Sequence, residues 1–65
     1  MRVENEAEGK KDVEGASLKA KEGMAAFKRG KYEESVAAFT QAIAMDRSDY
    51  RYYLNRGYCL GKLER

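Results

Sequence analysis

One stretch of the sequence, KRGKYEESVAAFTQAIAMD over residues 28–46, constrains the fold more than any other. Its apolar and small residues recur at steps of three and four, which draws a single stripe along a helix. Glu33 and Glu34 fall in the first turn, where the positive end of the helix dipole favours acids. Gly30 lies just before, where a preceding helix needs a left-handed residue to stop. The stretch therefore predicts a turn and an amphipathic helix. Its stripe consists of Tyr32, Ser35, Val36, Phe39, Ala42 and Ile43.

The same periodicity predicts a helix on each side of this one. The first covers residues 16–29, with Ser17 or Asp12 as its N-cap, and the very short loop at Gly30 makes it an antiparallel neighbour. The third runs from about residue 50 to 62, after a polar turn that offers Ser48 or Asp49 as N-cap. There is no proline and no alternating strand pattern, so we expect an all-α chain.

Helix two is the expected centre of the core. Its Val36, Phe39 and Ile43 are predicted to pack between the two outer helices. The expected contacts are Leu18, Ala26 and Phe27 on the first helix and Tyr53, Gly57 and Leu60 on the third. The apolar side of the third helix is read as Tyr50, Tyr53, Leu54, Gly57, Leu60 and Leu63.

Residues 1–15 contrast with the rest of the chain. They hold few apolar side chains and two glycines, too little to offset the entropy of ordering, so we expect a disordered leader or linker. Residues 16–65 are then one small helical module. A core of this size supplies only about 3–5 kcal/mol.

The amino-acid composition argues against several classes of function. There is no histidine, and the acids are dispersed, so we expect no enzyme, no metal site and no cofactor. The single cysteine, Cys59, reads as a buried apolar residue and favours a reduced, intracellular and cytoplasmic setting. The formal net charge of +2 is interspersed, which makes nucleic-acid binding an unfavoured alternative. No apolar run is long enough to span a membrane.

A repeat gives the sharpest clue. Gly23 and Gly57 are 34 residues apart, as are Lys28 and Lys62, and this is the period of a helix–turn–helix repeat. The order of residue types closely resembles the tetratricopeptide repeat (TPR) signature. The resemblance covers residues 16–65, with a first repeat at 16–49 and the first helix of a second at 50–65. The positions that match are Gly23, Ala26, Gly30, Tyr32, Ser35, Phe39 and Ala42.

Three positions depart from the family pattern. Arg47 replaces the usual proline after the second helix, Ser35 replaces a common alanine, and Lys19 replaces an aromatic residue near the start of the first helix. None of these is expected to break the fold.

The resemblance implies a non-catalytic scaffold that binds a peptide or partner protein along the first helix of each repeat. Phe27 is equally well read as an ordinary core residue. The implied partner-binding positions are Ala20, Met24, Phe27, Lys28, Asn55 and Tyr58.

Two alternatives stay open. A TPR subgroup clamps the acidic C-terminal tails of chaperones with a lysine and two asparagines; Asn55 matches one of these, whereas Ala20 and Met24 occupy the other two places. Self-assembly is the second alternative, because the third helix has no following helix to cover it. We therefore expect a fragment, a partly molten monomer, or a homo-oligomer formed through that helix, for example by domain swapping.

Overall fold

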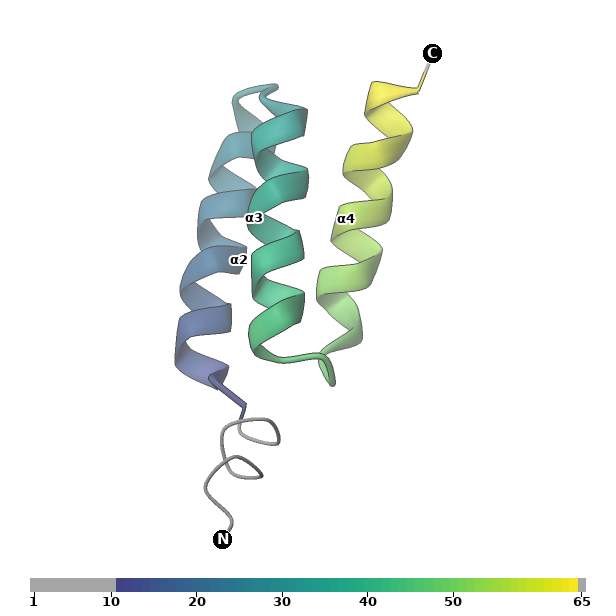
Figure 1. The fold of residues 1–65 in the computed structure, drawn as a ribbon. Coiled ribbons are helices and arrows are strands. Elements are labelled where there is room, and N and C mark those ends of the chain that lie inside the picture. Colours follow the sequence, from purple (N-terminus) through teal and green to yellow (C-terminus); the bar gives the residue numbers. More distant parts are fainter. Residues whose placement is uncertain (1–10, 65) are drawn as a thin grey trace, which may run out of the picture.

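The computed structural model describes residues 11–64, which form three consecutive antiparallel α-helices (Figure 1). Helix α2 spans Val13–Lys28, α3 spans Tyr32–Met45 and α4 spans Tyr50–Leu63. Helix α3 lies in the middle and packs against both of the others. The predicted all-α helix–turn–helix architecture is confirmed, and no strand occurs in residues 11–64.

Helix α2 begins earlier than the sequence suggested. Asp12 is its N-cap and accepts a hydrogen bond from the Gly15 backbone N–H at 2.8 Å, which decides between the two proposed caps. The Asp12 backbone N–H also donates to the Met45 carbonyl at the end of α3. Residues 13–15 are therefore helical, and the expected leader is wrong for them. Its residues 1–10 lie outside the described part of the chain.

The turn between α2 and α3 forms as predicted around Gly30. This residue has φ = 77°, in the left-handed region that glycine alone enters at no steric cost. The Lys31 N–H donates to the Ala26 carbonyl and the Gly30 N–H to the Phe27 carbonyl, at 2.9 Å each. These two bonds make a Schellman motif, which satisfies carbonyls left free at the helix end.

The turn between α3 and α4 needs no proline. Asp46 is buried, and its Oδ1 accepts hydrogen bonds from the Ser48 N–H at 3.1 Å and from the Ser48 hydroxyl at 2.7 Å. Asp49, one of the two residues proposed as N-cap, accepts from the Arg51 N–H and starts α4. The polar residues after α3 thus make the turn that proline often makes in this repeat.

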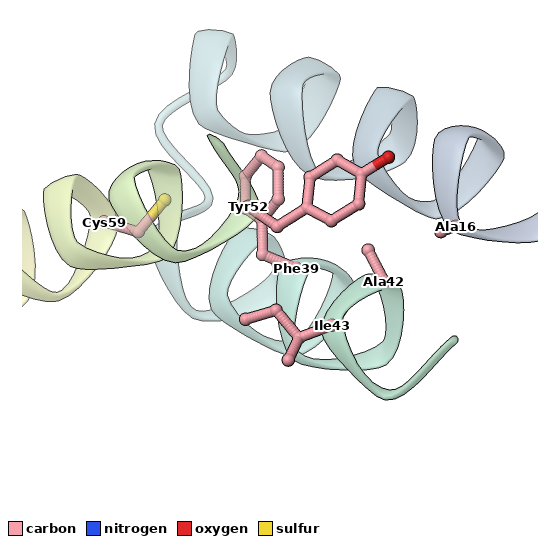
Figure 2. Close-up of a cluster of buried hydrophobic side chains, with 6 residues drawn as sticks. All are labelled: Ala16, Phe39, Ala42, Ile43, Tyr52 and Cys59. Carbon is pink, nitrogen blue, oxygen red and sulfur yellow. The ribbon is translucent and has the colours of Figure 1, made fainter. Parts of the chain in front are cut away.

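The core is centred on Phe39, which is 1% exposed (Figure 2). Its ring lies on Gly23 of α2, where a Cβ atom would come within 2.7 Å of the ring. Glycine is therefore required for α2 and α3 to approach this closely. The other buried apolar residues of the cluster are Ala16, Ala42, Ile43, Tyr52 and Cys59.

The predicted packing faces are partly wrong. On α4, Tyr52 and Cys59 are buried, whereas Tyr53 and Leu60 are 41% and 49% exposed. Helix α4 has two apolar stripes. The sequence prediction favours the stripe with more apolar residues, but that stripe does not face α3. Leu18 of α2 is 61% exposed. Its size favours a place in the core, but it lies out of phase with the buried Ala16, Gly23 and Ala26.

Candidate functional site

A small apolar cavity opens where all three helices meet. It has a volume of about 110 Å³. Met24 and Phe27 of α2 form one wall, and Asn55 and Tyr58 of α4 form the other. All four belong to the predicted partner-binding set. Phe39 of α3 and Cys59 of α4 complete the lining.

A second hollow of about 230 Å³ continues from this cavity along the same two helices. Met24 and Asn55 line both, so the two hollows are adjacent, and together they are called here the α2–α4 groove. Ala20, another predicted residue, lies in the second hollow, and Lys28 lines neither hollow. The remaining lining residues of the second hollow are Ser17, Lys21, Arg51 and Tyr52.

The walls differ in how firmly they are held. Phe27 is half-buried and packs edge-on against Tyr32, with ring centroids 5.3 Å apart. It therefore serves the core and the groove together. Met24 is 44% exposed and Tyr58 is 71% exposed. A thioether side chain and a tyrosine at an open rim can adapt their contacts to an incoming chain.

Asn55 is the polar residue at the centre of the groove. It is half-buried and belongs to both hollows. Its amide offers two N–H donors and one carbonyl acceptor. An amide in an otherwise apolar wall can hydrogen-bond the backbone of a bound segment, whatever the side chains of that segment are.

The charge of the groove is basic at one end. Arg51 makes a two-pronged ion pair with Asp49, with Nε and Nη2 at 2.9 and 2.6 Å from its carboxylate oxygens. The hydrogen bonds from Arg51 lower the pKa of Asp49, and the same hydrogen bonds and charge raise the pKa of Arg51. Neither ion pair among the described residues involves Lys21. Within residues 11–64, Lys21 is therefore the cation of the groove that has no ion-pair partner.

A buried polar junction supports the floor of the groove. The Ser35 hydroxyl on α3 donates to the Gly23 carbonyl on α2 at 2.7 Å, and its oxygen lies 3.0 Å from the Cys59 sulfur on α4. Because the one hydroxyl hydrogen is used on Gly23, the thiol is the donor in the second contact. Three residues thereby join three helices. Sequence reasoning identified Ser35 only as small and Cys59 only as buried; their polar atoms on apolar stripes were the signal.

The described residues hold no group of three or more histidine, cysteine or acidic side chains arranged for a metal ion. None of the helices in residues 11–64 combines the length and the apolarity that a membrane crossing requires.

Comparison with known proteins agrees with this geometry. A family model described as TPR repeat matches residues 23–63, which is more than half of the chain. The chain belongs to the TPR repeat family, whose domains generally mediate protein–protein interaction. No curated protein and no solved structure matched the chain.

Proposed function

We propose that this chain binds an extended segment of a partner protein in the α2–α4 groove, without catalysing a reaction. The observation that carries the proposal is the 110 Å³ cavity, because Met24, Phe27, Asn55 and Tyr58 come together around it from two helices. An apolar cavity with one convergent polar group is the usual form of a ligand site.

The size of the cavity limits what it accepts. An apolar cavity of about 150 Å³ in another protein accommodates benzene, and this one is smaller, at about 110 Å³. An aliphatic side chain of the bound segment fits such a volume better than an aromatic ring. Asn55 beside it then holds the backbone of that segment in register.

The chaperone-tail alternative is less well supported. A carboxylate clamp needs a lysine and an asparagine where this chain has Ala20 and Met24, and both of these line the groove. Only Asn55 matches the clamp, and Lys21 supplies a cation at the rim. The groove is therefore better suited to an apolar anchor than to a pair of carboxylates.

The test begins with selection of peptides on the protein from a displayed library of random ten-residue segments. Affinities of the selected peptides are then measured by fluorescence anisotropy for the parent and for Met24→Glu. Met24 is 44% exposed, so a charge there blocks the groove and leaves the core intact. We expect binding to Met24→Glu to weaken about tenfold or more, equivalent to about 1.4 kcal/mol.

Leu18→Glu is the matched control. Leu18 is an exposed apolar residue of the same helix and lines neither hollow. We expect it to bind the peptides as the parent does. Equal affinity of the parent, Met24→Glu and Leu18→Glu would contradict the proposal. Selection of peptides rich in acids with no aliphatic residue would favour the chaperone-tail alternative instead.

A further inference from the structure

Ser35 of α3 carries a hydroxyl where close packing alone needs only a small side chain. The residue is 0% exposed. Burying a hydroxyl costs free energy unless its hydrogen bonds are made inside the protein, and here they are. The hydroxyl donates to the Gly23 carbonyl at 2.7 Å, and its oxygen lies 3.0 Å from the Cys59 sulfur. One oxygen atom therefore links α2 and α4 through α3.

Both contacts of this hydroxyl lie directly behind the walls of the apolar cavity. On α2, Gly23 precedes Met24 in the chain, and its carbonyl is also the helical acceptor for the N–H of Phe27, four residues later. On α4, Cys59 follows Tyr58 and itself lines the cavity. A movement at either contact is therefore passed to side chains that form the cavity.

The separation of the two walls depends on this link more than on any other hydrogen bond. Helices α2 and α4 both pack on α3, and in residues 11–64 no hydrogen bond joins α2 directly to α4. A second side-chain hydrogen bond between α3 and α4 runs from Arg56 to Thr40 at 3.3 Å. It is exposed, and neither of its residues lines the groove.

We propose that Ser35 is a positioning residue that sets the separation of the groove walls, and that it thereby limits the size of the side chain a partner can anchor there. The proposal rests on the proposed function and adds a determinant of its specificity. With the hydroxyl present, Gly23 and Cys59 are held on either side of one atom, and the cavity stays at about 110 Å³. Without it, the thiol can turn and α4 can move away from α2, so the cavity admits a larger anchor.

The test compares two versions of one selected peptide. Its anchor is the residue whose replacement by alanine weakens binding most, and the two versions carry leucine or phenylalanine there. We expect the parent to favour the leucine version about tenfold or more. In Ser35→Ala we expect that preference to fall to about threefold or less. A role confined to stability would lower both affinities equally and leave their ratio unchanged.

Thr40→Ala is the matched control. It removes a hydroxyl from the same helix and breaks the bond to Arg56, outside the groove, so it should keep the ratio of the parent. Ser35→Ala should still fold, because the Gly23 carbonyl keeps the N–H of Phe27 and alanine is the better helix former. A parent that binds both versions equally overturns the proposal. So does an unchanged ratio in Ser35→Ala, or an equal change in Thr40→Ala.

A second measurement needs no peptide. Cys59 is the single cysteine of the chain and is 1% exposed, so its rate of alkylation by iodoacetamide reports opening of α4 at the junction. Ser35→Ala should raise this rate about tenfold or more, and Thr40→Ala should not. Urea unfolding of the same variants separates local opening from a loss of overall stability. Equal rates in Ser35→Ala and the parent would overturn the positioning role.

Failure of this inference is distinguishable from failure of the proposed function. Equal binding of the peptides by the parent and Met24→Glu would overturn the proposed function, and with it the role of Ser35 in partner choice. Weakened binding by Met24→Glu, together with an unchanged ratio and an unchanged alkylation rate in Ser35→Ala, would overturn the role of Ser35 alone.

Discussion

At the scale of single residues, two glycines at equivalent positions of the repeat have different structural roles. Gly23 lies beneath the ring of Phe39, where a Cβ atom would come within 2.7 Å. Gly57, 34 residues later, has open space around it. The repeat period predicts that both positions are small. In residues 11–64 a neighbouring helix packs on Gly23 and none packs on Gly57. This difference decides that glycine is required at the first position and lies at an open surface at the second.

The two glycines should therefore respond oppositely to alanine. Gly23→Ala forces Phe39 out of place, at about 1–3 kcal/mol, which exceeds the gain of up to about 1 kcal/mol in helix propensity. Gly57→Ala keeps the propensity gain alone and should stabilise the fold by up to about 1 kcal/mol. Urea unfolding followed by circular dichroism measures both. The account of the core would be contradicted if Gly23→Ala proved as stable as Gly57→Ala.

At the same scale, the junction of Ser35 with Gly23 and Cys59 shows what sequence pattern leaves out. The sequence pattern predicts that Ser35 lies on the small and apolar stripe of α3, and the usual packing of a lone cysteine, not the periodicity of α4, predicts that Cys59 is buried; both residues are buried. The pattern carries no information on which carbonyl the hydroxyl meets, or that the thiol reaches the same oxygen from a third helix. These two contacts join residues that lie 12 and 24 positions apart in the sequence. They therefore depend on how whole helices are placed relative to one another.

At the scale of the elements, helix ends were predicted better than helix faces. Gly30 and Asp49 act at the turns as their local chemistry indicates. The start of α2 was missed by three residues, because two polar residues could each cap it. The buried face of α4 was missed because this helix is apolar on two sides. The residues next to a helix end determine where the helix starts or stops. Which face of the helix is buried depends instead on the helices that pack against it.

The turn before α4 predicts a pH dependence. Hydrogen bonds from the Ser48 hydroxyl and N–H lower the pKa of Asp46 below its ordinary value of 3.8. A lowered folded-state pKa stabilises the fold above that ordinary value, and the stabilisation is lost as the pH falls through the folded-state pKa. Asp46→Asn should therefore have a lower melting temperature than the parent at pH 7.

The difference between the two melting temperatures should narrow below about pH 4 and vanish when Asp46 is protonated in the folded protein too. Thermal unfolding at a series of pH values measures it. Ser48→Ala removes one of the two hydrogen bonds and should show a smaller difference of the same sign. A difference that stays constant from pH 7 to about pH 2.5 would show that the charge of Asp46 plays no part.

At the scale of the whole molecule, α3 is enclosed and α4 is held from one side. Helix α3 has Ser35, Phe39, Ala42 and Ile43 buried, whereas α4 has only Tyr52 and Cys59 buried. Local opening is easiest where few buried contacts hold an element. We expect the backbone amides of α4 to exchange with solvent faster than those of α3 when the chain is monomeric.

Hydrogen exchange of the protein, followed by nuclear magnetic resonance, measures this difference. Uniform protection of all three helices in the monomer would contradict a hairpin with a more loosely attached third helix.

The groove could be anticipated only through the repeat as a whole. Five of the six predicted residues line it, while Lys28 does not. The TPR resemblance indicates positions along α2 and α4, but it does not identify the residues that form the floor of the groove. Phe39 and Cys59 reach the cavity because α3 holds the outer helices at that separation. Lys21, which is not among the six predicted residues, also lines the groove.

The central claim is that partners bind in the α2–α4 groove, and the place of binding tests it most directly. A peptide selected on the protein is titrated into isotope-labelled chain, and amide and methyl shifts are followed by nuclear magnetic resonance. We predict that the largest shifts occur at Met24, Phe27, Asn55 and Tyr58. Shifts confined to Tyr53, Leu54 and Leu60, which line neither hollow of the groove, would contradict the claim.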